Sequence, residues 1–207
     1  MFEDVKNCGS GKFVSRGEWL HPDRVIDSWE VIFVTSGCVY IQENEVAYQL
    51  GKNDILLLEA GMHHYGYKKS VNTSFYWVHF TEAPPIDPAL KYQHSIDSYN
   101  LSLLFKQLMH YRAENIGSES LDYLTRLILI ELFRKRTPKE ISHIANKAAA
   151  WITANRDVLL KVKQVAEYLG YNVDYLNRVF KENYGKTIKE FIDEEKNAAN
   201  QNIADHR

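Results

Sequence analysis

The stretch 161–183, KVKQVAEYLGYNVDYLNRVFKEN, constrains the fold more than any other part of this chain. Apolar residues recur at helical spacing up to Leu169, which predicts a first short helix. Gly170 follows, and glycine takes the left-handed conformation that ends a helix without a steric cost. Asn172 is a suitable N-cap for a second helix, because its side-chain oxygen can accept a free backbone N–H. The stretch therefore predicts two short helices joined by a tight turn.

The second predicted helix has one apolar and one polar face. Its apolar side chains are Leu176, Val179 and Phe180, and its polar ones are Asp174, Asn177, Arg178 and Lys181. Ala166 in the first helix is small enough to let the two helices cross closely. This pattern is typical of a helix-turn-helix, whose second helix enters the DNA major groove in known cases. An ordinary αα-corner would show the same spacing.

Residues 166–192, AEYLGYNVDYLNRVFKENYGKTIKEFI, resemble the first helix-turn-helix of AraC-type transcription regulators. The positions that match the family's pattern are Ala166, Leu169, Gly170, Tyr171, Tyr175, Leu176, Arg178, Phe180, Lys181 and Gly185. Asn172 stands where the family usually has serine. The resemblance implies a DNA partner, and a linker helix after the motif.

On that interpretation, the exposed face of the second helix would contact DNA. Asn177 and Arg178 are the best candidates for contacts to base edges, and Asp174 could accept from a cytosine amine. Lys181 and Lys186 are expected to contact phosphates, which position a helix without specifying sequence. The alternative is that these side chains form an ordinary solvated helix face.

A series of short β-branched or aromatic runs predicts strands between residues 19 and 80. The runs are Trp29–Thr35, Val39–Glu43, Val46–Leu50, Asp54–Leu58 and Thr73–Phe80, separated by turn residues. Many short strands with close turns favour an antiparallel barrel or sandwich of the jelly-roll kind, a group that includes the cupins. The segment 28–67, followed by FYWVHF, also resembles the cupin-like sensing domain that precedes the DNA-binding half of AraC-type proteins.

A barrel of this kind can enclose a cavity for one small-molecule effector. The wall candidates are Trp29, Tyr40, His64 and Trp77, together with Tyr65 and Tyr76, and Arg16 and Arg24 are candidate anchors for an anionic group. An aromatic face suits the apolar side of a sugar or another ring, so a sugar is one candidate effector. About half of the aromatic side chains on alternating strands must instead pack the sandwich, and the strand registers are needed to tell which.

The same region offers few residues for a metal site. Catalytic cupins hold a metal with a His-x-His pair and a Glu from one motif and a His from the next. Asp27 and Trp29 stand near the expected His pair, which leaves His64 as the remaining imidazole. A first-row transition metal usually needs three or four ligands, so no metal and no other cofactor is predicted. His63, Asp27 and Glu30 could in principle complete a set.

Two helices are predicted after the barrel. The proline-bearing segment Thr81–Asp97 is expected to be a connector. Ser98–Ala113 and Ser120–Lys135 follow as helices, and the second is apolar around most of its circumference, so it must be covered on more than one side. AraC-type proteins commonly pair through helices at this position, which implies a homodimer. The alternative is that the barrel alone buries this helix.

Two further helix starts are marked by capping boxes. Thr137, Pro138 and Glu140 combine a capping box with proline at the first helical position. Thr187 and Glu190 repeat the capping-box spacing, which predicts the start of the linker helix.

The C-terminal part departs from the family's pattern in three ways. Asn197, Asn200 and Asn202 stand where the family prefers apolar or small residues, so this tail is expected to face water or fray. The chain ends at Arg207, and the family's second helix-turn-helix is therefore expected to be absent. From residue 138 onward, eleven basic and ten acidic side chains leave a net charge of about +1, whereas DNA affinity rests largely on neutralising phosphates.

Length and composition bound the class of protein. The 207 residues suit one or two domains, and no apolar run reaches the roughly 18 residues of a membrane span. The N-terminus lacks the layout of a signal peptide, which predicts a cytoplasmic location. Cys8 and Cys38 fit neither a metal-ligand spacing nor a disulfide framework.

Together these patterns predict an α+β chain in three parts. They are a cupin-like antiparallel barrel over residues 1–96, a helical dimerisation and linker region over 97–136, and an all-α, partial AraC-type DNA-binding domain over 137–207. The expected function is a ligand-responsive, dimeric transcription regulator with weak DNA binding and no enzyme activity. A small-molecule binder or dimerisation partner that does not itself bind DNA is the first alternative, and a cupin metalloenzyme is the second.

Overall fold

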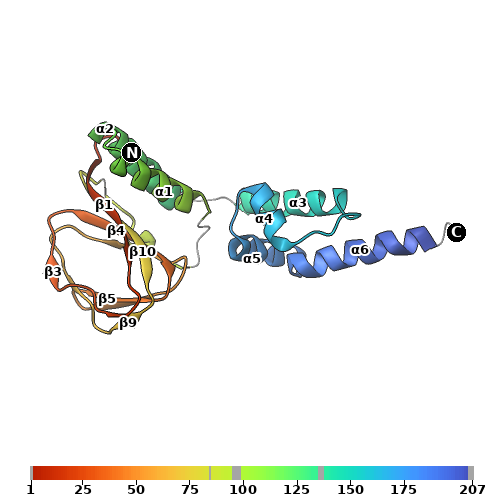
Figure 1. Cartoon of the computed structure of the whole chain (residues 1–207), viewed down its shortest axis with the longest axis horizontal. Helices are drawn as coiled ribbons and strands as arrows, with labels where there is room; N and C mark the ends of the chain where they lie inside the picture. The colour runs from red at the N-terminus through yellow and green to blue at the C-terminus, as the bar shows by residue number, and fades with distance from the viewer. Residues whose placement is uncertain (1, 84, 95–98, 135–137, 205–207) are drawn as a thin grey trace. The chain divides into compact units, whose positions relative to one another are not determined.

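The computed structural model describes residues 2–83, 85–94, 99–134 and 138–204, with the side chains of 138, 139 and 199–204 left out (Figure 1). The strands are β1 (Lys6–Val14), β2 (Glu18–Trp19), β3 (Arg24–Val25), β4 (Trp29–Ser36), β5 (Val39–Glu43), β6 (Val46–Leu50), β7 (Ile55–Leu58), β8 (His63–Tyr65), β9 (Ser70–Val71), β10 (Ser74–Thr81) and β11 (Tyr92–Gln93). The helices are the 3-10 turn η1 (Pro88–Leu90), α1 (Tyr99–Ala113), α2 (Ser118–Phe133), α3 (Pro138–Ala154), α4 (Val162–Leu169), α5 (Val173–Tyr184) and α6 (Ile188–Ala204). The chain divides into two compact units, the strands with α1 from Leu101 and α2, and the helices α3–α6.

The first unit is an antiparallel barrel of the cupin-like kind. One sheet has the order β1-β10-β4-β7-β11, a second has the order β3-β8-β5-β6, and β2 pairs with β9. A buried core shared by the two larger sheets includes Ile32, Val34, Val39, Ile41, Leu50, Leu56, Leu58 and Phe75. The predicted β5 and β6 are confirmed residue for residue, and the ends of β4, β7 and β10 differ from the prediction by one residue. The α+β class predicted from the sequence is confirmed.

The five-stranded sheet is apolar on both faces because both faces are covered. Along β4, Val31 and Phe33 belong to the core shared with α1 and α2, whereas Ile32 and Val34 belong to the barrel interior. Successive side chains of a strand point to opposite faces, so a sheet buried on both sides reads as a nearly continuous apolar run. The apolar runs Val31–Val34 of β4, Ile55–Leu58 of β7 and Phe75–Val78 of β10 follow from this arrangement.

The strand β1 begins before the predicted strand region and pairs with β10 along most of its length. Its sequence, KNCGSGKFV, carries Gly9 and Gly11, and glycine is depleted in strands, so the segment has the composition of a loop. A shift of register between Asn7 and Gly9 adds an irregularity to the pairing. Long-range pairing with an aromatic strand, and not local propensity, therefore makes this segment a strand.

The predicted connector 81–97 is in part a piece of the barrel, and that prediction is corrected. Its β11 pairs with β7, placing Tyr92 opposite Leu56. Lys91 forms ion pairs with the carboxylates of Glu43 and Glu59, the latter at 2.6 Å. The prolines of this segment predict turns, and Pro88 begins the 3-10 turn η1, but the backbone and charge contacts that return the chain to the sheet have no local signature.

The helices α1 and α2 pack on the outer face of the five-stranded sheet (Figure 1). Their buried side chains include Leu101, Phe105 and Leu108 of α1 and Ile128, Leu129 and Leu132 of α2. The helix predicted over 120–135 starts two residues earlier, directly after Gly117, and ends at Phe133 because Arg134 is extended. Lys135 and Ser98, the predicted end and start of these helices, lie outside the described residues.

The second unit contains the predicted helix-turn-helix. Gly170 follows α4 in the left-handed conformation, with φ 73° and ψ 33°. The side chain of Asn172 caps α5 by accepting from the backbone N–H of Tyr175 at 2.7 Å. Leu176 and Phe180 of α5 are fully buried against α3 and α4, as the apolar face predicted.

The linker helix α6 starts where the capping box predicts. The backbone N–H of Thr187 donates to Glu190 at 2.7 Å, and the backbone N–H of Glu190 donates to the Thr187 hydroxyl at 3.3 Å. Asn197 is exposed, as expected, but the backbone is helical to Ala204, so the predicted fraying does not begin at this residue. The side chains of Asn200 and Asn202, like the predicted cap Thr137, lie outside the described residues.

Candidate functional site

The barrel contains a cavity of about 210 Å³. Its lining residues are Phe13, Trp19, His21, Pro22, Arg24, Glu30, Phe75, Trp77 and His79. Phe13 anchors the aromatic part of the wall, because its ring centroid lies 4.4 Å from that of Trp19 and 4.9 Å from that of Phe75. The cavity thus combines flat apolar walls with a small number of polar side chains, which is typical of small-molecule sites.

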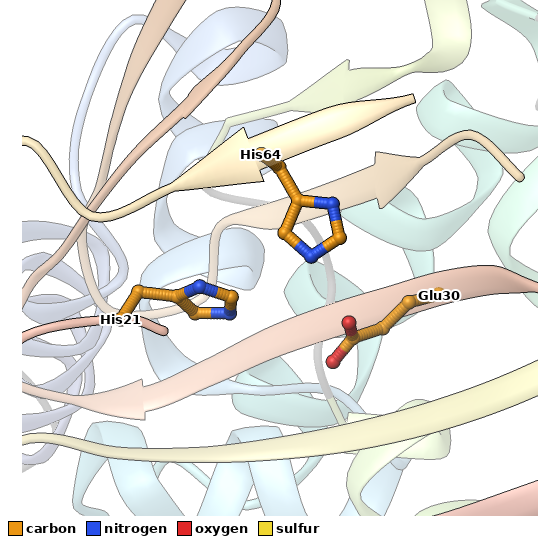
Figure 2. A group of neighbouring side chains, drawn as sticks. All are labelled: His21, Glu30 and His64. Atoms are coloured by element: carbon orange, nitrogen blue, oxygen red, sulfur yellow. The ribbon is translucent and has the colours of Figure 1, made fainter. Parts of the chain in front are cut away.

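Three buried polar side chains come together beside this cavity, and two of them, His21 and Glu30, line it. One ligand-type atom from each of His21, Glu30 and His64 lies within 4.8 Å of the other two. Figure 2 shows the two imidazole rings and the carboxylate pointing toward one another. They come from the loop after β2, from β4 and from β8, and each side chain is buried. We call these three residues the His–Glu–His cluster.

Arg24 connects two members of the cluster. Its Nε donates to Nε2 of His64 at 3.2 Å, and its Nη2 donates to Oε2 of Glu30 at 3.0 Å. The pairing of β3 with β8 places Arg24 directly opposite His64, which explains the first of these contacts. Oε2 of Glu30 also lies 3.5 Å from Nε2 of His79 on the neighbouring strand β10.

Burial controls the protonation of the cluster. It lowers the pKa of His21 to about 4 and that of His79 to about 4, and the charge of Arg24 pushes both in the same direction. Burial also lowers the pKa of His64, with a smaller contribution from Arg24. The pKa of Glu30 is raised to about 7 by burial, although its contact with Arg24 favours the carboxylate. The three imidazoles are therefore neutral near pH 7.

The structure brings some of the predicted ligand-binding residues together and separates others. Arg24 and Trp77 line the cavity, and His64 lies in the His–Glu–His cluster. Trp29 precedes Glu30 on β4, so its side chain points to the opposite face and packs against the core beneath α1 and α2. Tyr40 instead contacts Tyr67, at 5.8 Å between ring centroids. Which face of its strand a side chain occupies decides whether it can reach the cavity.

The sequence analysis left His64 as the remaining imidazole for a cupin-type metal site. That count is wrong, because His21 lies beside His64 and Glu30. No regular spacing relates His21 to Glu30 or His64, and only the folding of three separate segments brings them together. The two other ligands considered from the sequence, Asp27 and His63, are exposed, and His63 pairs with Asp23 at 2.6 Å. No sequence signal could have found His21, because it lies in a loop and no local pattern places that loop against β4 and β8.

The exposed face of α5 is the candidate DNA interface, and its predicted residues differ in their surroundings. Asp174 and Lys181 are exposed. Arg178 is half exposed, pairs with Glu182 at 3.2 Å and lies over the ring of Tyr175 at 5.3 Å. These side chains remain accessible to a partner that offers stronger contacts than a surface ion pair, which contributes little to stability.

The two remaining DNA candidates already have partners. The side-chain oxygen of Asn177 accepts from the backbone N–H of Ile188, the first residue of α6, at 3.2 Å. Lys186 forms an ion pair with Glu194 at 2.6 Å. A half-buried amide that caps the next helix has a structural role in addition to any contact with a base.

An apolar groove runs along α2. It is lined by Phe2, Glu3, Tyr123, Arg126, Leu127, Ile130, Phe133 and Arg134, with a volume of about 810 Å³. Tyr123, Leu127 and Ile130 are each about half exposed. The barrel therefore buries one side of α2 and leaves an adjoining apolar stripe uncovered.

Among the described residues, none of the helices combines the length and the apolar character that crossing a membrane requires.

A cavity-bearing barrel followed by a helix-turn-helix defines a class of protein, the transcription regulators that carry a ligand-binding domain. Two family models identify the family. Residues 12–114 match the AraC-like ligand binding domain, and residues 160–193 match the bacterial regulatory helix-turn-helix proteins of the AraC family. The chain is an AraC-type transcription regulator with an N-terminal cupin-like domain.

One relative has a similar arrangement over most of the chain. An uncharacterized HTH-type transcriptional regulator of Bacillus subtilis (strain 168), YisR, is 26% identical over 218 residues, which cover 89% of this chain and 74% of the relative. Among solved structures, a putative mannose-6-phosphate isomerase from Ralstonia eutropha JMP134 is similar over 37% of this chain and 84% of its own, with 16% identity and a TM-score of 0.31. A Cupin 2 conserved barrel domain protein from Salinispora arenicola CNS-205 is similar over 38% and 75%, with 12% identity and a TM-score of 0.30.

Proposed function

We propose that this regulator is a dimer that binds a small molecule in its barrel and DNA through α5 of each subunit. The observation that carries the proposal is the pairing of α4 and α5 about the left-handed Gly170, which leaves Asp174, Arg178 and Lys181 on one exposed helix face. A recognition helix reads base edges with side chains of this kind. A cytoplasmic location is part of the proposal, and a DNA partner supports it.

The effector that suits the cavity is a small polar molecule with an apolar face, for which a sugar is the leading class. Trp77 and Trp19 offer flat apolar walls, and Arg24 and Glu30 offer a donor and an acceptor in the same cavity. A volume of about 210 Å³ limits the ligand to a single ring or a molecule of similar size. Trp29 and Tyr40 are not included in this proposed site.

The groove on α2 supports the proposed dimer. Leu127 and Ile130 are about half exposed, on a helix whose other side is fully buried in the barrel unit. Contiguous exposed apolar surface of this kind marks interaction sites in proteins that are otherwise polar outside. A second copy of the same helix would present the same stripe, as an isologous contact requires.

DNA binding is expected to be weak and strongly dependent on salt. The eleven basic and ten acidic side chains from residue 138 onward leave about one net positive charge to attract phosphates. Arg178 and Lys186 must also exchange their pairing with Glu182 and Glu194 for contacts with DNA. Two recognition helices in a dimer offset part of this weakness, because they bind adjacent grooves together.

The test is a fluorescence anisotropy titration of the full chain with promoter fragments at low and at physiological salt. We expect complexes at low salt that weaken steeply as salt rises. Arg178→Ala should reduce the preference for the best fragment, at a cost of about 1–3 kcal/mol, whereas Arg156→Ala, on an exposed arginine of the α3–α4 loop, should not. Absence of any complex at low salt would contradict the proposal.

A second candidate function is that of a dimerisation partner that does not itself bind DNA. It is favoured by Asn177, whose amide oxygen already accepts from the first N–H of α6 and so has a structural role without DNA. Co-expression with a full-length regulator of the same family distinguishes the two functions. Mixed dimers together with no DNA complex of the isolated chain would support the partner function.

A further inference from the structure

We propose that His21, Glu30 and His64 form a binding site for a divalent transition-metal ion, and that the guanidinium of Arg24 stands in for that ion in the described structure. Two imidazoles and one carboxylate are the ligand types that suit Zn²⁺, Fe²⁺, Co²⁺ and Ni²⁺. The donor atoms lie within 4.8 Å of one another and belong to three separate segments of the barrel (Figure 2). With three protein ligands, a bound ion would have room for a further ligand such as water.

The hydrogen bonds of both histidines orient them as metal ligands. Nδ1 of His21 lies 2.9 Å from the carbonyl oxygen of Pro22, and Nδ1 of His64 lies 3.3 Å from that of Met62. A carbonyl oxygen only accepts, so each Nδ1 carries the proton and each Nε2 of the neutral ring presents a lone pair, which in His64 accepts from Nε of Arg24. Metal-binding histidines are held in this way, with the remote nitrogen donating to a backbone carbonyl.

The buried carboxylate of Glu30 is stabilised in its ionised form only by a nearby cation. Glu30 is only 2% exposed, and an ionised carboxylate at such a position requires a paired charge. Arg24 supplies that charge, and the same side chain donates to Nε2 of His64, which is the lone pair that a metal would use. Arg24 therefore satisfies two of the three proposed ligands at once, as a metal ion would.

The guanidinium is also able to leave. The side chain of Arg24 is 36% exposed, whereas that of Glu30 is 2% exposed, so Arg24 can turn toward solvent without opening the core. Metal binding and the contacts of Arg24 are mutually exclusive on this geometry. The set differs from the His-x-His arrangement of catalytic cupins, because His21 comes from the loop before β3.

The proposal is independent of the effector and of DNA, because metal binding is measured on the purified chain alone. The full chain is stripped with a chelator, dialysed and titrated with Co²⁺, and the visible absorption of the bound ion reports its ligands. Competition with Zn²⁺ then gives the relative affinity. We expect one ion per chain and a spectrum of low coordination number that shows nitrogen and oxygen ligands.

The variants His21→Gln and Glu30→Gln should each weaken binding by about 100-fold or more, beyond the roughly 10- to 100-fold seen for loss of an outer-shell partner. The matched control is His63→Gln, which removes an exposed histidine that pairs with Asp23 outside the cluster. It should leave the affinity and the spectrum unchanged. Equal affinity in His21→Gln and the wild type, with both folded by circular dichroism, would overturn the proposal.

Arg24→Gln gives a test that does not depend on deleting a ligand. It removes the competing cation and leaves the three ligands in place, so the affinity for Co²⁺ should rise about tenfold or more, as expected for loss of roughly 1.4 kcal/mol of competition. Unchanged or weaker binding in this variant would show that Arg24 does not occupy the metal position. Failure of both the wild type and Arg24→Gln to bind any metal would refute the site itself.

Discussion

The ring of Trp77 lies directly against Gly11, its partner across the β1–β10 pairing. A Cβ atom on Gly11 would lie 2.5 Å from Cζ2 of that ring, which is closer than any real contact. The glycine therefore makes room for the tryptophan that lines the barrel cavity. Arg112 of α1 lies on the same ring, 5.9 Å from its centroid, so the position of Trp77 is held from two sides.

Gly11→Ala should displace Trp77 and destabilise the barrel by about 1–3 kcal/mol, as overpacking of a core does. Chemical denaturation measures the free energy of unfolding, and the tryptophan emission spectrum should shift in the folded state. The control is Gly17→Ala, because a Cβ at Gly17 meets nothing within 4 Å. A Gly11→Ala protein as stable as the control would mean that the ring has another position available.

The parts of the fold that depend on local chemistry could be predicted from the sequence. The left-handed Gly170 and the Asn172 cap define the helix-turn-helix within a few residues of chain. The strands β5 and β6 were predictable because the two turn residues Asn44 and Glu45 separate two runs that are rich in β-branched and aromatic residues. In each case, the physical cause lies within the segment that it shapes.

Features that depend on distant segments could not be predicted. The glycines of β1 give this segment the composition of a loop, and it is a strand only because it pairs with β10. Trp29 and Trp77 are equally plausible wall residues until the register shows that they lie on opposite faces of one sheet. His21 meets Glu30 of β4 and His64 of β8 only when three separate segments of the barrel come together, so this histidine was missed.

Stability of the barrel should fall as the pH is lowered, in part because of His79. Its folded pKa of about 4 lies below the usual value of 6.5, so folding favours the neutral ring. This contribution is fully present above about pH 6.5 and is lost as the pH falls through about 4. Denaturation of wild type and His79→Gln between pH 4 and 7 should show a smaller loss in the variant, by about 1–3 kcal/mol.

The pKa of Glu30 is shifted in the opposite direction to that of His79, so wild type and His79→Gln must be compared at each pH. Its pKa is raised to about 7, so the stability that it contributes in the protonated form is lost as the pH rises through that value. The wild-type curve alone mixes both effects, whereas the difference between wild type and variant isolates His79. Identical slopes in the two proteins would show that His79 is not held neutral by the fold.

Dimerisation through α2 should be abolished by a charge on its exposed stripe. Ile130 lines the groove and is 51% exposed, so Ile130→Glu should not disturb the barrel. Pairing of two α2 helices would bury the new carboxylate, which costs free energy. Sedimentation velocity is expected to show a dimer for the wild type and a monomer for the variant. Leu103→Glu, at a position 49% exposed on α1, is the control and should remain dimeric. A monomeric wild type would contradict the proposed interface.

The amide of Asn177 separates a structural role from base recognition. Because its oxygen accepts from the first N–H of α6, Asn177→Ala should cost about 0.5–2 kcal/mol of stability, as loss of a helix cap does. Asn183→Ala is the matched control in the same helix, since that amide only donates to the carbonyl of Val179 and should change stability by less than about 0.5 kcal/mol. Thermal unfolding by circular dichroism measures both. If Asn177 also contacts a base, Asn177→Ala should lose its preference between DNA fragments at temperatures where the variant is fully folded. If Asn177 only caps α6, that preference should be unchanged.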